Sequence, residues 1–196
     1  MAGAPKAAAI VLAAGVSKRM GADKMLLAVG GRSLVRRAVE AASAAGPPFV
    51  VVGDRCTAVE RELAGVPCRF VVNPERDGPS SGSLHRGLRE LPPDVGAAIV
   101  VLGDMPFVTA AMVGALIEHA TADPAPLVVS RYAGVYAPPL LFRRSLFDEL
   151  LAWNGEGCGK QVVMRHEREA AFIDWPAERL ADIDTAGDLW VAEQRA

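Results

Sequence analysis

The sequence predicts a single α/β domain in which helices cover both faces of a mostly parallel sheet. Short apolar runs alternate with longer amphipathic segments along the chain. The apolar runs are continuous rather than alternating in polarity, which is typical of strands that are covered on both faces. With 51% hydrophobic and 22% charged residues, and no linker or repeat, residues 1–196 are expected to form one domain.

Each expected element follows from this alternation. Five buried strands, each ending near a turn residue, are expected at Ala7–Ala13, Phe49–Val52, Arg69–Val72, Ala97–Leu102 and Leu127–Val129. Helices are expected at Leu34–Ala45, Ala58–Leu63, Ser83–Leu91, Ala110–Ala120, Ser145–Ala152 and Ala186–Glu193. The strand–helix–strand order implies right-handed crossovers and a Rossmann-like three-layer α/β/α architecture. Ligands of such sheets bind beyond the carboxyl ends of the strands, so the residues that follow each strand carry the functional information.

Composition excludes several classes of protein. The formal net charge is -2 and no long block of Lys and Arg is present, so a nucleic-acid partner is not expected. The three cysteines are scattered and include no CxxC, which excludes a disulfide framework or a zinc site and indicates a reducing, cytoplasmic location. No stretch approaches the ~20 apolar residues of a membrane span, so no membrane partner is expected.

The segment after the first expected strand combines small and basic residues. Ala13, Ala14 and Gly15 let backbone amides approach a ligand closely. Arg19 and Lys24 are suited to bind phosphate, the first as a fork of donors and the second as a point charge. Neither G-x-x-x-x-G-K-[ST] nor G-x-G-x-x-G is present. The segment is interpreted as a phosphate-binding loop, and the alternative is a surface loop with solvated charges.

A carboxylate follows the expected strand Ala97–Leu102, at the same edge of the sheet. Asp104 in Gly103-Asp104-Met105-Pro106 is suited to hold Mg²⁺ directly or through water, with phosphate oxygens and solvent completing the shell. The alternative is a turn residue or a helix cap, although Thr109 is expected to cap the next helix. Together with the basic loop, Asp104 favours a magnesium site.

Two further segments are candidates for the same site. The Gly/Ser-rich turn after the third strand offers N–H groups and hydroxyls to a base or ribose through Ser80, Ser81 and Ser83, or it serves as an ordinary serine cap. Near the end of the chain, alternation in an extended segment points Asp182 and Asp184 the same way, so Asp184 is a candidate second metal ligand or acceptor contact.

The favoured alternative for this last segment is a helix cap. Thr185 or Asp184 would cap the last helix, with Asp188 answering in the manner of a capping box.

These motifs resemble a known family. Leu12-Ala13-Ala14-Gly15, Ser17-Lys18-Arg19-Met20-Gly21, and Lys24 with Leu26-Leu27 and Gly30 resemble the signature of the MobA-like nucleotidyltransferases, which include the enzymes that attach CMP or GMP to molybdopterin. Gly103–Thr109 resembles the second block, whose aspartate binds magnesium. The resemblance implies that residues 12–15 hold the nucleotide, that Arg19 and Lys24 neutralise the triphosphate and the developing pyrophosphate, and that the serine stretch contacts the nucleobase side.

The function expected from the resemblance is magnesium-dependent transfer of a nucleotide from a nucleoside triphosphate to a phosphorylated small molecule such as molybdopterin, releasing pyrophosphate. In-line attack needs position and charge neutralisation rather than a protein nucleophile. Ala14 resembles the cytidylyl branch, where guanylyl-transferring relatives have glycine, so CTP is expected and GTP is the alternative. An interaction with a molybdoenzyme or a maturation chaperone is also implied.

The acceptor side departs from the family pattern. Tyr132–Phe142 lacks the Gly-His-Pro of many molybdopterin enzymes, and Gly155–Lys160 replaces a typical Gly-Asp-x-Gly-Ala-Arg, although Lys160 is still suited to an acceptor phosphate. One alternative is therefore a sugar-phosphate or alcohol-phosphate acceptor. Alternatives of another class are a catalytically silent nucleotide-binding protein and a dinucleotide-dependent oxidoreductase, for which Asp54 lies further from Gly15 than the usual ~20 residues.

Overall fold

The computed structural model describes residues 5–15, 23–54, 56–75, 80–157 and 159–196. A seven-stranded sheet has the order β5-β4-β1-β6-β8-β7-β9. Its strands are β1 Ala7–Leu12, β4 Phe49–Gly53, β5 Arg69–Asn73, β6 Ala97–Leu102, β7 Leu127–Tyr132, β8 Val135–Arg143 and β9 Ala171–Trp175. All pairings are parallel except those of β8, which runs antiparallel to β6 and β7.

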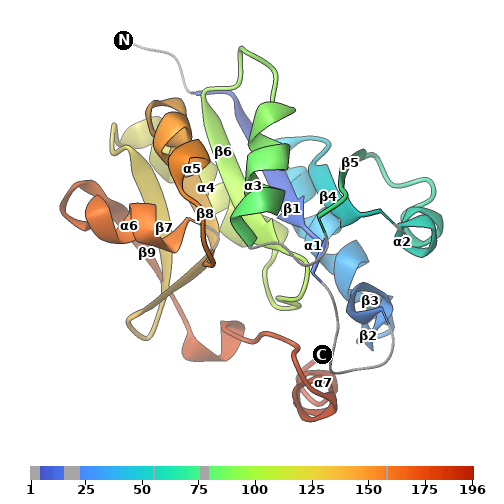
Figure 1. The fold of residues 1–196 in the computed structure, drawn as a ribbon. Helices are drawn as coiled ribbons and strands as arrows, with labels where there is room; N and C mark the ends of the chain where they lie inside the picture. Colours follow the sequence, from blue (N-terminus) through green and yellow to red (C-terminus); the bar gives the residue numbers. More distant parts are fainter. Residues whose placement is uncertain (1–4, 16–22, 55, 76–79, 158) are drawn as a thin grey trace.

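Helices cover both faces of this sheet (Figure 1). The α-helices are α1 Leu34–Ala42, α2 Thr57–Glu62, α3 Ser80–Arg89, α4 Ala110–Ala122, α5 Phe147–Ala152, α6 Lys160–Arg165 and α7 Ala186–Glu193. Short 3₁₀ helices are η1 Lys24–Leu26, η2 Ser43–Ala45, η3 Arg144–Leu146, η4 Glu167–Glu169 and η5 Ala177–Arg179, and a small hairpin is formed by β2 Ala28–Val29 and β3 Arg32–Ser33. The predicted three-layer α/β/α fold with a mostly parallel sheet is confirmed. Among the described residues, no helix has both the length and the apolar character that a membrane crossing needs.

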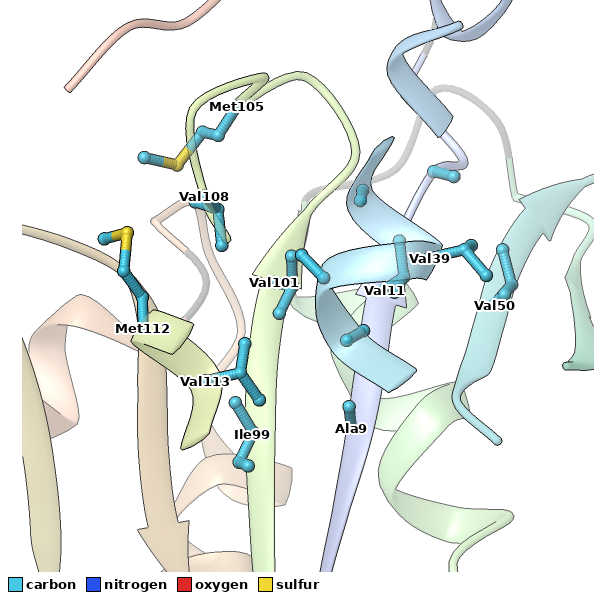
Figure 2. Close-up of a cluster of buried hydrophobic side chains, with 14 of the residues drawn as sticks. Ala9, Val11, Val39, Val50, Ile99, Val101, Met105, Val108, Met112 and Val113 are labelled. Carbon is cyan, nitrogen blue, oxygen red and sulfur yellow. The ribbon is translucent and has the colours of Figure 1, made fainter. Parts of the chain in front are cut away.

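Two hydrophobic cores lie on opposite faces of the sheet, and both are built from the continuous apolar runs. Figure 2 shows the first, in which Val11, Val50 and Val101 of the strands face Val39 of α1 and Val113 of α4. The second contains alternate residues of the same strands, packed against α3, α5 and α6. Because successive residues of a strand point to opposite faces, a strand buried on both sides needs apolar side chains throughout.

Two strands of the sheet were not predicted from the sequence. β8 contains Pro138 and Pro139, which lack the N–H groups of a regular ladder, and its register against β7 shifts at this point. Two buried side chains of β7 bind the carbonyl groups of these prolines. The Ser130 hydroxyl donates to Pro139 O at 2.7 Å, and the Tyr132 hydroxyl donates to Pro138 O at 2.7 Å. β9, an edge strand, is the second.

The expected helix boundaries needed some correction. α3 begins at Ser80 rather than Ser83, and α1 ends at Ala42, where the 3₁₀ helix η2 follows. α6 was not expected at all. Thr109 caps α4 as predicted, because its side chain accepts a hydrogen bond from Met112 N.

Two helical glycines give a matched test of this packing. An added Cβ at Gly87 in α3 would lie 2.4 Å from Ile10 Cγ2, whereas one at Gly114 in α4 would meet no atom within 4 Å. Gly87→Ala should therefore destabilise the fold by roughly 1–3 kcal/mol, because α3 must move off β1. Gly114→Ala should instead stabilise it by about 0.5–1 kcal/mol, since alanine favours a helix over glycine. Urea unfolding measures both, and effects of the same sign would contradict this account of the packing.

Candidate active site

The ends of β1 and β6 lie side by side, and close packing holds them there. Gly103 N donates to Leu12 O at 2.9 Å, and Ala13 N donates to Val51 O of β4 at 2.8 Å. An added Cβ on Gly103 would lie 2.7 Å from Met25 Sδ and 3.1 Å from Leu12 O. Glycine at this position therefore lets the chain after β6 approach the chain after β1, and it places the next residue, Asp104, beside the opening loop.

Lys24 lies at the centre of the site. Asp23 caps the 3₁₀ turn that carries it, since Asp23 Oδ1 accepts from Met25 N at 3.1 Å. The Lys24 side chain is 11% exposed, and its Nζ donates to Asp104 Oδ2 at 2.8 Å and to Asp184 Oδ1 at 2.7 Å. Burial alone would lower the pKa of Lys24, but the hydrogen bonds and charges of the two aspartates outweigh it and raise the pKa above its usual value. The ammonium group is therefore positively charged at neutral pH.

The segment before α7 brings the second carboxylate to this lysine. Ile183 is fully buried, and its N–H donates to Asp104 O at 3.2 Å. Thr185 caps α7 in a capping box with Asp188, which confirms the cap predicted from the sequence. Because Thr185 provides the cap, the carboxylate of Asp184 is left to bind Lys24.

Asp182 adds a third acidic group that interacts electrostatically with Lys24, Asp104 and Asp184. Desolvation by the surrounding protein, together with the negative charges of Asp104 and Asp184, raises the pKa of Asp182 to about 6, although the residue as a whole remains exposed to solvent. The positive charge of Lys24 opposes this rise. With three carboxyl groups around one ammonium, the site has an excess of acidic groups among the described residues.

The donor set fits a hard divalent cation. Asp104 Oδ1 is buried and has no hydrogen-bond partner among the residues that the structure describes. Within those residues no group of three or more His, Cys, Asp or Glu side chains is arranged to hold a metal ion. Proteins usually bind Mg²⁺ through one or two carboxylates, and water and phosphate oxygens fill the remaining positions. Asp104 and Asp184 are therefore the residues that could hold the ion.

The opening loop lies partly within the described chain. The side chains of Leu12, Ala13 and Ala14 are buried, and Ala13 and Ala14 belong to the cores on opposite faces of the sheet. Gly15 is exposed, and an added Cβ there would meet no atom within 4 Å. The side chains of residues 12–14 are therefore not available to a ligand, and the backbone groups Ala13 N and Leu12 O are already hydrogen-bonded within the protein. The nucleotide-binding role of residues 12–15 stays a prediction. Arg19 lies outside the described residues, so its predicted convergence with Lys24 stays a prediction.

The predicted serine residues make contacts that the sequence did not suggest. Ser80 Oγ accepts from Gly157 N at 3.0 Å and Ser81 Oγ accepts from Gly155 N at 3.1 Å. In return, Ser81 N donates to Gly155 O, and Ser80 N donates to Glu156 Oε2 at 3.1 Å. The start of α3 is thereby joined to the segment 155–157, which precedes α6. The role of these serines in nucleotide binding stays a prediction.

The third serine is also engaged within the protein. Ser83 Oγ accepts from Asn73 Nδ2 at 3.0 Å, so it links α3 to the end of β5.

Lys160, the candidate for an acceptor phosphate, is exposed at the first position of α6. Glu156 is a residue that sequence reasoning missed, because its partner is 76 positions away in the chain.

Comparisons of the chain with known proteins agree on one family of nucleotidyltransferases. The model of the MobA-like NTP transferase domain matches residues 9–170. The bifunctional protein GlmU of Kineococcus radiotolerans is 36% identical over 204 residues, which cover 95% of this chain and 41% of that protein. A probable molybdenum cofactor guanylyltransferase of Natranaerobius thermophilus is 25% identical over 147 residues, covering 66% of this chain and 62% of that protein. The chain spans about a third of the length of the GlmU relatives that it matches.

Solved structures show the same fold. The crystal structure of Rv0371c from Mycobacterium tuberculosis superimposes with a TM-score of 0.83 and 26% identity, covering 99% of this chain and 100% of that chain. A structure of Rv0371c in complex with manganese has a TM-score of 0.79 at 23% identity, covering 97% of this chain and 99% of that one.

The raised pKa of Asp182 gives a prediction for the metal-free protein. The folded pKa of about 6 exceeds the ordinary value of 3.8, so the folded state holds the proton more tightly than the unfolded state does. This contribution to stability is fully present below about pH 4 and is lost as the pH rises through 6. Asp182→Asn should therefore raise the free energy of unfolding at pH 7.5 and leave it nearly unchanged at pH 4. Urea unfolding in EDTA at both pH values measures this difference, and an equal effect at both would contradict it.

Proposed function

The chain belongs to the MobA-like NTP transferase family, and from this premise we propose that it transfers a nucleotide from a nucleoside triphosphate to a phosphorylated small molecule, with release of pyrophosphate. The observation that carries the proposal is the sharing of the Lys24 ammonium by Asp104 and Asp184 at the carboxyl edge of the sheet. Family membership favours this transferase activity over a dinucleotide-dependent oxidoreductase.

In the proposed reaction an oxygen of the acceptor phosphate attacks the α-phosphorus, and the bond from that phosphorus to pyrophosphate breaks. The protein supplies position and charge. The backbone of residues 12–15 would hold the nucleotide, and Lys24 and Arg19 would bind the negative charge that builds up on pyrophosphate. Ser80, Ser81 and Ser83 would lie on the side of the base or ribose. Because Ser80 N and Ser81 N donate within the protein and all three hydroxyl oxygens accept there, the hydroxyl O–H groups are what these serines would offer to the nucleotide.

Asp104 and Asp184 would hold a divalent cation, for which Mg²⁺ is the first candidate. The buried, unpartnered Asp104 Oδ1 supports such a site, as does the manganese complex of the structural neighbour Rv0371c. When bound, the cation would neutralise phosphate charge and favour departure of pyrophosphate.

For the nucleotide we propose CTP, with GTP as the alternative. The support is Ala14, which resembles the cytidylyl branch. For the acceptor we propose molybdopterin, supported by the similarity to the probable molybdenum cofactor guanylyltransferase of Natranaerobius thermophilus. The alternative acceptor is a sugar phosphate or an alcohol phosphate, because residues 132–142 and 155–160 depart from the pattern of molybdopterin enzymes.

Pyrophosphate release tests the proposal directly. The protein should release pyrophosphate from one of CTP, GTP, ATP and UTP in the presence of Mg²⁺ and an acceptor drawn from molybdopterin, sugar phosphates and alcohol phosphates. Thermal shift with each triphosphate and with NADH runs in parallel. Tight binding of NADH without pyrophosphate release would instead support the oxidoreductase, and triphosphate binding without turnover on any acceptor would support a silent binding protein.

Asp104→Asn should lower turnover by about 100-fold or more, the usual cost of removing one electrostatic contact to the transition state. The matched control is Asp94→Asn, since Asp94 also pairs with a lysine, Lys6 at 2.6 Å, but at the amino end of the strands. The control should retain full activity. Thermal melting verifies that both variants fold, and equal turnover by the two variants would contradict the assignment of Asp104.

A further inference from the structure

The Lys24 ammonium lies between the two carboxylates that would hold a divalent cation. Asp104 Oδ2 and Asp184 Oδ1 both lie within 2.8 Å of the same nitrogen. The three groups come from η1, the β6–α4 connection and the segment before α7, so they meet only in the folded chain. The ammonium is therefore a built-in counter-ion for a pair of acids that would otherwise repel each other.

This pairing opposes binding of a metal ion by itself. An ion bound to these two oxygens would lie next to the ammonium, and two positive charges at such a distance repel strongly where solvent is scarce. The Lys24 side chain is 11% exposed and that of Asp104 25%, so water screens the repulsion poorly on this side, whereas the Asp184 side chain is 63% exposed and faces solvent. Asp104 Oδ1 has no hydrogen-bond partner among the described residues, but an ion that also uses Asp104 Oδ2 and Asp184 Oδ1 must replace the two hydrogen bonds from Lys24. The carboxylates thus become fully available only when Lys24 moves.

A triphosphate is the ligand that would draw Lys24 away. Its negative oxygens accept charge-assisted hydrogen bonds from an ammonium as well as a carboxylate does. The flexible four-carbon stem of lysine lets the ammonium change partners while the backbone stays in place. That backbone is anchored by the Asp23 cap and by Met25, which is buried in the core.

We propose that Lys24 is an exchangeable counter-ion, so that a nucleoside triphosphate, by taking over its ammonium, releases Asp104 and Asp184 for the divalent cation and the two ligands bind cooperatively. The inference rests on the proposed function. Binding free energies are reciprocal, so the cation increases the affinity for the triphosphate by the same factor.

The sharpest test is a titration of the nucleotide-free protein with Mn²⁺, with free Mn²⁺ followed by electron paramagnetic resonance. Lys24→Met should bind Mn²⁺ at least about tenfold more tightly than the wild type, even though it loses turnover, because the competing charge is gone. Lys24→Arg keeps the charge and should bind as weakly as the wild type. Lys6→Met removes the lysine that pairs with Asp94 at the opposite end of β1 and should change nothing. Equal or weaker Mn²⁺ binding by Lys24→Met overturns the proposal.

A second measurement uses the wild type alone and so does not depend on whether Lys24→Met folds. A non-hydrolysable analogue of the triphosphate that gives the largest thermal shift should increase the affinity of the protein for Mn²⁺ at least about fivefold, after correction for Mn²⁺ bound by the analogue in a protein-free titration. An unchanged affinity overturns the coupling.

The two proposals fail in different ways. Mn²⁺ binding could depend on Lys24 as described while no pair of triphosphate and acceptor releases pyrophosphate. In that case the counter-ion proposal is supported and the proposed function is wrong. If pyrophosphate is released but Mn²⁺ binding does not change when Lys24 is replaced, the proposed function is supported and the counter-ion proposal is wrong.

Discussion

The arrangement at the carboxyl edge of the sheet depends on one poorly solvated ammonium that two carboxylates share. Lys24 is buried, and a buried charge is costly unless it is paired and hydrogen-bonded. Asp104 and Asp184 meet this need from positions 80 and 160 residues away. These contacts connect three segments: the chain after β1, the chain after β6 and the segment before α7. Each segment contributes one side chain to a site that no single segment could form.

The scaffold around this point leaves little room for other arrangements. Gly103 allows the end of β6 to lie against the end of β1, and Ile183 anchors the last segment through its buried side chain and its hydrogen bond to Asp104 O. At the start of α3, reciprocal hydrogen bonds join Ser80 and Ser81 to residues 155–157. A sheet edge whose connections carry the functional side chains suits a reaction that depends on position and charge more than on a nucleophile.

Much of the fold could be read from the order of residues because strands covered on both faces need unbroken apolar runs. β1, β4, β6 and β7 carry such runs and were predicted, with the helices between most of them. The edge strand β5 was also predicted, but its expected burial was wrong, because Phe70 and Val72 lie on a face that is exposed to solvent. β8 was missed because Pro138 and Pro139 interrupt the local signal of a strand. Its prolines are accommodated by hydroxyl groups from β7, and no local pattern reveals such a partner.

The sequence by itself determined which residues follow the strands, and therefore that Lys24 and Asp104 would meet, because parallel strands deliver their carboxyl ends to one edge. It also determined that Thr185 and Asp188 would form a capping box, since that motif is local. Only the tertiary structure decided that Asp184 reaches Lys24 and that Glu156 reaches Ser80 N. Hydrogen bonds between distant segments depend on the packing that brings those segments together, and spacing along the chain does not encode that packing.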